Sequence, residues 1–278
     1  MPQIFSFFTH FFSRFWGSLI FYTALRIPQT WAIAFDGIAG FAPLVGILIG
    51  GLMGLSSLTL NYLGMPILTS SAIAVGLWIL ITGGLHLDGV MDAADGLAVT
   101  EGDRRLEVMA DSKTGAYGVM AGIMVILLKI LALHDLNQQL NFQNGLDYIF
   151  LMMAVCGWAR WGQLVAIYRY PYLRPSGKGA FHKDAITSVW DLVPSTLLLM
   201  VLAIAQVLIN PNWWILGVLT AVMGGAIAYL VGAWFNHKLA GHTGDTYGAV
   251  VEWTEALLLC GLTLVVNLLI NNVVNNVG

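Results

Sequence analysis

Charged residues are scarce in this sequence, since Asp, Glu, Lys and Arg make up only 10% of its 278 residues. The 12 Lys and Arg residues do not outnumber the 15 Asp and Glu residues, and the formal net charge is -3. This balance lacks the basic surplus of a nucleic-acid-binding surface. The sequence is instead 58% hydrophobic, with a mean hydropathy of +0.78. Such a composition predicts a polytopic membrane protein.

Cysteine is also rare, and Cys156 and Cys260 are the two examples. Both lie in apolar runs without a Cys-x-x-Cys motif or a histidine at ligand spacing, which argues against a zinc site or a redox pair. We expect both to be small core residues. The first residues lack the basic segment and small-residue cleavage site of a secretory signal, so we expect no removable signal peptide.

Seven apolar runs are long enough to cross a bilayer, which takes roughly 20 residues each. They cover residues 37–60, 67–85, 116–133, 148–168, 190–209, 213–235 and 248–271. In residues 5–25 polar residues recur at helical spacing, which favours an amphipathic helix in the membrane interface; an imperfect first transmembrane helix is the alternative. The sequence thus predicts an all-α fold of about seven transmembrane helices plus the interfacial helix. We expect one integral-membrane catalytic domain over residues 1–278.

The basic residues predict the orientation of the chain. With seven spans, ten of the twelve fall on the same side as the N-terminus: Arg14, Arg26, Arg104, Arg105, Lys113, Arg169, Arg174, Lys178, Lys183 and Lys238. Because cytoplasmic loops carry the excess of Lys and Arg, we expect the N-terminus in the cytoplasm and the C-terminus outside. Three polar loops, residues 86–115, 169–189 and 236–247, then share the cytoplasmic face.

The first of these loops holds an unusual concentration of carboxylates. Seven of the fifteen acidic residues lie between positions 88 and 111: Asp88, Asp92, Asp95, Glu101, Asp103, Glu107 and Asp111. The first three stand at i, i+4 and i+7, so a helix would project them from one face, and the last two repeat the i, i+4 spacing. Oxygen ligands without His or Cys neighbours indicate a magnesium-like ion that also holds phosphates. A solvated loop whose acids balance nearby bases is the structural alternative.

The other two loops supply bases, glycines and hydroxyls. Arg174 and Lys178 lie in the second loop and Asp245 in the third, where glycines would let the backbone approach a ligand. Acid on one loop and base on another indicate a metal and phosphate site between them. Ordinary positive-inside topology explains the bases of the second loop equally well, and Thr243–Thr246 can be read as a simple turn.

Two basic residues lie within predicted spans, where charge is costly unless it is paired or hydrated. Arg160 is expected to point inward, while Lys129 either does the same or extends to the outer interface. Glu252 and Glu255, at the start of the last span, could meet one of these bases. His86 adjoins Asp88 and is either a phosphate donor or a hydrogen bonder at a helix end.

These motifs resemble those of a known family. Its signature matches Gly83-Gly84-Leu85-His86-x-Asp88-Gly89-x-x-Asp92-x-x-Asp95-Gly96 and Arg105-x-x-x-Met109-x-Asp111-Ser112-x-x-Gly115-x-x-Gly118. Further matches are Arg26-Ile27-Pro28, Arg174-Pro175 with Gly177 and Gly179, and Thr243-Gly244-Asp245-Thr246-x-Gly248-Ala249 followed by Glu252. The chain resembles the cobalamin-5'-phosphate synthase family, also called adenosylcobinamide-GDP ribazoletransferase, over nearly its whole length. One departure is His242, where such proteins usually have a second glycine.

The resemblance implies a Mg-dependent enzyme of the bacterial or archaeal inner membrane that acts late in vitamin B12 assembly. It would join adenosylcobinamide-GDP to alpha-ribazole or its 5'-phosphate, giving adenosylcobalamin or its 5'-phosphate and GMP. The expected partners are these substrates and the lipid bilayer, with no nucleic acid; a second copy of the chain and other corrin-pathway enzymes are further candidates.

Residue roles follow as expectations. Asp88, Asp92, Asp95 and Asp111 would hold Mg²⁺. Asp111 or Glu107 would accept a proton from the attacking ribose hydroxyl, and Asp95 is a further catalytic candidate. The remaining candidates would contact substrate, mainly its phosphates: His86, Arg104, Arg105, Lys113, Arg160, Arg174, Lys178 and Asp245.

Two other functions compete with this one. The acidic motif is partly similar to that of CDP-alcohol phosphatidyltransferases, which also displace a nucleoside monophosphate from a pyrophosphate. A cation or phosphate transporter would use the intramembrane charges as its pathway, but such proteins place charges in broken helices of related halves, and no internal repeat is visible here.

Overall fold

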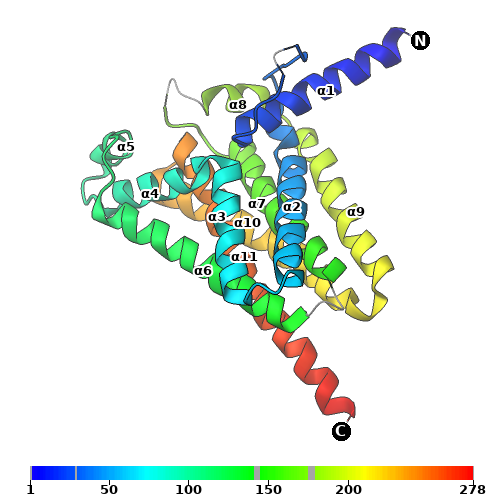
Figure 1. Ribbon diagram of the computed structural model, residues 1–278. Helices are drawn as coiled ribbons and strands as arrows, with labels where there is room; N and C mark the ends of the chain where they lie inside the picture. The colour runs from blue at the N-terminus through cyan, green and yellow to red at the C-terminus, as the bar shows by residue number, and fades with distance from the viewer. Residues whose placement is uncertain (1, 29, 141–144, 175–178, 278) are drawn as a thin grey trace.

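A computed structural model describes the chain except residues 1, 29, 141–144, 175–178 and 278 (Figure 1). Its described residues are mainly helical and contain no strand beyond an isolated bridge between Tyr172 and His242. The α-helices are α1 (Pro2–Tyr22), α2 (Ala42–Tyr62), α3 (Ile67–Thr82), α4 (Leu85–Ala98), α5 (Arg105–Val108), α6 (Ala116–Leu140), α7 (Gly145–Arg169), α8 (Ala180–Ala185), α9 (Val193–Ile209), α10 (Trp214–Leu239) and α11 (Gly244–Val277). The predicted all-α fold is confirmed.

Within the described part of the chain, six helical segments are long and apolar enough to cross a membrane. They are Ile38–Tyr62, Ala116–Leu140, Gly145–Arg169, Val189–Ile209, Pro211–Leu239 and Gly244–Asn271, and the bent pair α3 and α4 would be a seventh. Each of the six overlaps one predicted run, so the prediction of a polytopic membrane protein is confirmed. The predicted run 67–85 corresponds to α3 alone, which passes as a span only together with α4. Helix α1 is not among these segments.

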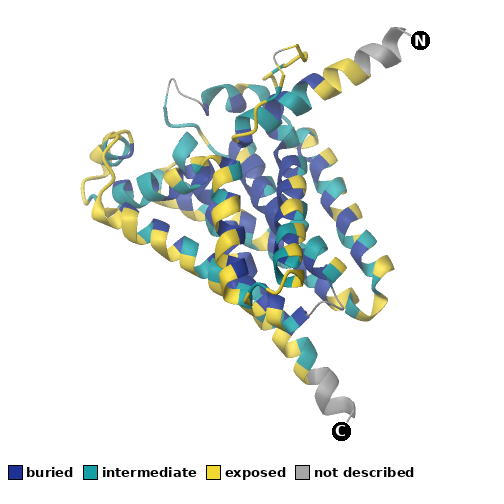
Figure 2. Ribbon diagram, viewed as in Figure 1, coloured by how far each residue is buried: buried dark blue, intermediate teal, exposed yellow. Residues whose placement is uncertain are grey.

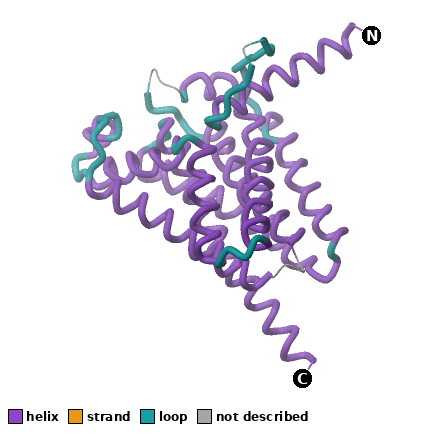
Figure 3. Tube along the Cα trace, viewed as in Figure 1, coloured by secondary structure: helices purple, strands orange, loops and turns teal. Residues whose placement is uncertain are grey.

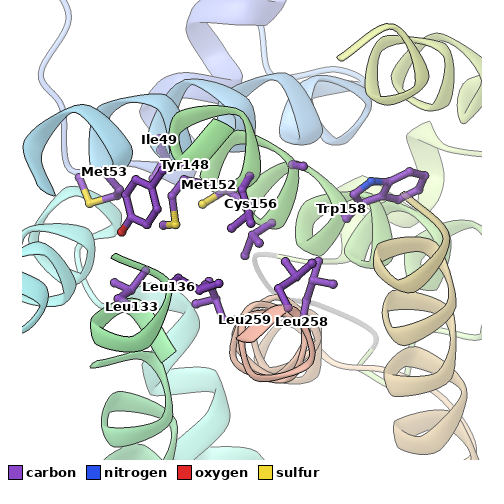
Figure 4. Close-up of a cluster of buried hydrophobic side chains, with 14 of the residues drawn as sticks. Ile49, Met53, Leu133, Leu136, Tyr148, Met152, Cys156, Trp158, Leu258 and Leu259 are labelled. Atoms are coloured by element: carbon purple, nitrogen blue, oxygen red, sulfur yellow. The ribbon is translucent and has the colours of Figure 1, made fainter. Parts of the chain in front are cut away.

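The bundle is built around α7, which is buried along most of its length (Figure 2). Helix α2 packs directly on it because Gly46 and Gly50 remove two side chains: an added Cβ would lie 2.3 Å from the Cys156 carbonyl oxygen and 2.2 Å from that of Met152. Small residues let membrane helices approach in this way. Figure 4 shows side chains of α2, α6 and α11 meeting α7 in the apolar core. Cys156 is buried there, whereas Cys260 is intermediate.

A sharp break separates α3 from the acidic helix α4. Gly83 and Gly84 both have positive φ angles, 62° and 69°, which glycine adopts at little cost. The two helices consequently meet at 90°. Helix α4 then crosses the start of α11, where a Cβ on Gly89 would lie 2.3 Å from the Asp245 carbonyl oxygen. The break therefore brings the acidic helix against the third polar loop.

The second and third polar loops are fixed to each other by backbone hydrogen bonds. The Leu173 N–H donates to the His242 carbonyl (2.8 Å), and the His242 N–H donates to the Pro171 carbonyl (2.9 Å). The His242 ring is fully buried, stacked between Tyr170 and Tyr247, and burial lowers its pKa to about 4. A neutral, packed side chain thus occupies the position at which the sequence departs from the signature it resembles. Most loop segments lie at this end of the bundle, opposite the C-terminus (Figure 3).

Candidate active site

A cavity of about 330 Å³ lies where the three polar loops meet the end of α1. Its walls come from α1, α4, α7, α8, the second loop and the start of α11. The lining residues are Phe21, Tyr22, Leu85, His86, Asp88, Gln163, Tyr172, Arg174, Gly179, His182, Gly244, Asp245, Tyr247 and Gly248. The volume falls at the lower end of the range for ligand pockets, ~300–1,000 Å³.

Charged side chains form the more exposed part of the cavity wall. Asp88 is exposed, and Arg174 forms an ion pair of 3.0 Å with Asp245, their side chains being 26% and 23% exposed. This pair joins the second loop to the third. The structure thus places an acid and a base from different loops beside one another.

The deeper wall carries polar groups without charge. Tyr22, His86, His182 and Tyr247 are each at most 3% exposed, and Gln163 is 4% exposed. Within the described residues, the two tyrosine hydroxyls, both ring nitrogens of His86, Nε2 of His182 and Oε1 of Gln163 have no hydrogen-bond partner. Buried polar groups are nearly always paired, so an unpaired set around one cavity indicates a ligand or ordered water.

Sequence reasoning did not find most of this deeper wall. Tyr22 lies in the N-terminal helix, which was interpreted by its amphipathic pattern. Gln163 lies in an apolar span, and His182 in a loop that was interpreted by its basic residues. Burial lowers the pKa of His182 to about 4, so its imidazole is neutral at physiological pH. The one available signal was the presence of single polar residues within apolar surroundings, as at Gln163.

The acidic residues of α4 take different positions. Asp88 lines the cavity, while Asp92 lies within electrostatic reach of Asp88, Asp95, Asp245 and Arg174. Both carboxylate oxygens of Asp95 accept hydrogen bonds from backbone N–H groups. Oδ2 accepts from the Gly115 N–H (2.6 Å) and Oδ1 from the Gly118 N–H (2.8 Å). It therefore anchors the start of α6.

The four predicted metal ligands do not form one coordination shell. Among the described residues, no group of three or more His, Cys, Asp or Glu side chains is arranged to hold a metal ion. Asp111 is exposed and accepts from the Lys113 N–H (3.0 Å), and Glu107 is exposed on α5. Neither residue lines the cavity, so the structure does not bring the two predicted general bases to it.

The other predicted phosphate donors are also separate from the cavity wall. Arg104 pairs with Glu101, Arg105 donates to the carbonyls of Val99 and Lys238, and Lys113 is exposed. Lys178 lies outside the described residues. Of the predicted substrate contacts, the structure gathers His86, Arg174 and Asp245 around the cavity.

The intramembrane charges form a buried network. Lys129 contacts Glu252 (2.6 Å) and Glu255, and Arg160 contacts Glu255 (2.7 Å) and the Cys156 carbonyl (3.0 Å). Lys129 is 3% exposed, so it does not extend to the outer interface. The positive charges of the two bases are balanced by the negative charges of the two acids. Arg160 was a predicted substrate contact, but the structure pairs it inside the bundle and not on the cavity wall.

The fold and the cavity define a multi-pass membrane protein with a polar cavity at one end, bounded by carboxylates and an arginine. A family model described as cobalamin-5-phosphate synthase matches residues 14–263. The chain therefore belongs to the cobalamin-5-phosphate synthase family.

Relatives named adenosylcobinamide-GDP ribazoletransferase support this placement. That of Trichormus variabilis is 54% identical over 89% of this chain and 95% of its own length. Those of a Synechocystis species and Desulfitobacterium hafniense are 48% and 33% identical, again over 89% of this chain and over 93% and 95% of their own lengths. No solved structure matches the chain. The predicted family is confirmed, and with it the class of enzyme, a transferase of late cobalamin synthesis.

Proposed function

We propose that adenosylcobinamide-GDP reacts with alpha-ribazole or its 5'-phosphate at this cavity, releasing GMP. The observation that carries the proposal is the convergence of Asp88, Asp245 and Arg174 on a partly exposed cavity wall. A guanidinium binds phosphate oxygens with paired, charge-assisted hydrogen bonds. The neighbouring carboxylates supply acceptors for a cation and for a hydroxyl proton.

Magnesium fits this arrangement. Mg²⁺ is usually held by one or two carboxylates together with substrate phosphates, and it does not require a cage made entirely of protein. Asp88 and Asp92 stand one helical turn apart on α4 and would hold it, with Asp245 across from them. A bound Mg²⁺ would neutralise charge that develops on the phosphates. Asp95 and Asp111, predicted as further ligands, are engaged with backbone N–H groups instead.

The chain's own groups account for the remaining steps. Arg174 holds the diphosphate, and the acceptor's ribose hydroxyl attacks the cobinamide-linked phosphorus. A new oxygen–phosphorus bond forms while the bond to GMP breaks, and a carboxylate takes the hydroxyl proton. Asp245 lies on the cavity wall, opposite the two carboxylates that would hold Mg²⁺, and is better placed for this role than Asp111 or Glu107.

The cavity lies at the end of the bundle that carries the predicted cytoplasmic loops. Basic residues on this side support a cytoplasmic active site in the inner membrane, with the C-terminus outside. Soluble phosphorylated substrates would then be available to the enzyme without crossing the bilayer. Self-association and contacts with other corrin-pathway enzymes stay predictions.

The test is a reaction of detergent-solubilised protein with adenosylcobinamide-GDP and alpha-ribazole, followed by mass spectrometry. We expect a cobalamin and an equal amount of GMP, with Mg²⁺ required and chelation abolishing both products. A parallel reaction contains CDP-diacylglycerol and a polar alcohol. CMP and a phospholipid in that reaction, without cobalamin in the first, would overturn the proposal.

A further inference from the structure

We propose that the deep, uncharged part of this cavity binds the guanine base of the GDP group, and that the corrin ring and the base of ribazole bind outside it. The inference rests on the proposed function, because that function supplies a guanine nucleotide as substrate. It assigns Gln163, Tyr22 and Tyr247 to recognition of the leaving group.

The first argument is size. A cavity of about 330 Å³ accommodates a flat bicyclic base with part of its ribose. A corrin is a macrocycle of four linked rings with amide-bearing substituents, and it is much larger than a purine. The corrin must therefore remain outside the deep wall, near the open side of the cavity.

The second argument is the hydrogen-bonding capacity of the deep wall. Gln163 Oε1 is an acceptor, the hydroxyls of Tyr22 and Tyr247 both donate and accept, and each unpaired imidazole nitrogen is one or the other. Guanine offers N–H donors at N1 and the 2-amino group and acceptors at O6, N7 and N3. A benzimidazole nucleoside offers one ring nitrogen and otherwise carbon.

The difference between these two bases decides the assignment. Leaving a buried polar group unpaired costs about 1–3 kcal/mol, so a benzimidazole here would leave several such costs uncompensated. Guanine would satisfy most of them. A site built to hydrogen-bond a ligand rejects analogues that lack the partner groups.

The third argument is the order of charges along the cavity. The exposed part of the wall holds Arg174, Asp88 and Asp245, while the buried part holds neutral rings and an amide. The ring planes of Tyr22 and His182 lie 12° apart, giving the deep wall flat surfaces. A nucleotide has the same order, with a neutral aromatic base at one end and phosphates at the other. Guanine in the deep part would place its phosphates beside Arg174.

The inference is tested by equilibrium binding of GMP to the full-length protein in detergent with Mg²⁺. The competitors are IMP, which lacks the 2-amino group, AMP, and alpha-ribazole. We expect GMP to bind about tenfold or more tightly than IMP or AMP, and alpha-ribazole not to displace it. Equal binding of AMP and GMP, or displacement of GMP by alpha-ribazole, would overturn the inference.

A substitution of Gln163 tests whether this side chain recognises the guanine base. Gln163→Met keeps a side chain of similar length but removes the hydrogen-bond acceptor. We expect this variant to bind GMP about tenfold more weakly and to prefer GMP over IMP less than the wild type does. Its KM for alpha-ribazole should be unchanged. Gln206→Met, at another buried glutamine that does not line the cavity, is the matched control. Unchanged GMP binding in Gln163→Met would contradict the inference.

The two proposals fail in different ways. If the wild-type protein makes cobalamin but shows no guanine preference, this inference alone is wrong. If it makes no cobalamin under any condition, the proposed function is wrong. Should Gln163→Met not fold, the competition series with wild-type protein decides by itself.

Discussion

Lys129 of α6 and Glu252 of α11 form an ion pair of 2.6 Å inside the helix bundle, although 123 residues separate them in sequence. Glu255 joins Lys129 to Arg160, so the network ties α6, α7 and α11 together. A buried charge is tolerated only with its partner. The network therefore fixes the relative positions of three helices that lie beneath the cavity.

Removing one member should consequently destabilise the fold. Lys129→Met would leave Glu252 uncompensated, and we expect a loss of about 3–5 kcal/mol in the free energy of unfolding. The measurement is thermal unfolding in detergent. Lys113→Met, at an exposed lysine, should unfold like the wild type. An unchanged unfolding temperature for Lys129→Met would show that the pair contributes nothing.

Asp92→Asn tests the carboxylates of α4. It replaces one of the two carboxylates proposed to hold Mg²⁺ by an amide of the same shape, and we expect turnover to fall at least roughly a hundredfold because metal-ion stabilisation is worth several kcal/mol. GMP release is the measurement, with membrane insertion checked in parallel. Asp103→Asn is the matched control, since Asp103 is exposed and does not line the cavity. Near-normal turnover of Asp92→Asn would refute the metal assignment.

Arg174→Ala tests phosphate binding at the cavity wall. Hydrogen bonds to charged groups are worth about 1.5–3 kcal/mol, so the KM for adenosylcobinamide-GDP should rise roughly tenfold to a hundredfold. Arg104→Ala removes an arginine whose described ion pair is with exposed Glu101, and it should change this KM little. A KM increase of equal size in both variants would point to general surface electrostatics instead.

The pKa of His182 predicts a pH dependence of stability. Burial lowers it from 6.5 to about 4, so between these pH values the unfolded chain binds a proton that the folded protein does not. Stability should therefore fall as the pH drops from about 6.5, and the full effect is about 3 kcal/mol near pH 4. Thermal unfolding between pH 7 and 5 should show a shallower decline in His182→Gln. His10→Gln, at an exposed histidine, should keep the wild-type slope, and identical slopes in all three proteins would contradict the prediction.

Hydropathy predicted the spans, and the positions of the basic residues predicted that the three polar loops share one face. Both signals can be read from short stretches of sequence. The cavity is different, since it depends on where α1 and α8 end in space. Tyr22 and His182 are ordinary residues in their own segments, and their rings come within 6.0 Å only in the folded bundle. Nothing in the spacing of the two residues could predict that contact.

Asp95 shows that sequence spacing is also insufficient to predict the role of a residue near the cavity. Its place at i+7 from Asp88 correctly predicted a shared helical face, and from this we inferred a metal ligand. The turn before α6 brings two N–H groups to the carboxylate, from residues 20 and 23 positions away. A pattern of carboxylates on one helix does not reveal a competing partner from another segment.

The contact between Asp95 and the start of α6 leads to a final prediction. A Cβ at Gly115 would lie 2.5 Å from Asp95 Oδ1, so Gly115→Ala must displace either the carboxylate or the turn. Because α4 carries Asp88 and Asp92 as well, this shift should lower turnover by about tenfold or more while the fold persists, since an ångström-scale misplacement can cost ~100-fold in rate. GMP release and thermal unfolding, measured together, separate the two effects.

Gly102→Ala is the matched control, because a Cβ there meets nothing within 4 Å. It should retain full activity, although it lies in the same polar loop. If Gly115→Ala is as active as Gly102→Ala, the position of Asp95 does not matter for catalysis, and Asp88 and Asp92 must be held by other contacts of α4. If Gly115→Ala loses activity and unfolds early, the anchor acts through stability, and a milder Asp95→Asn substitution then distinguishes positioning from folding.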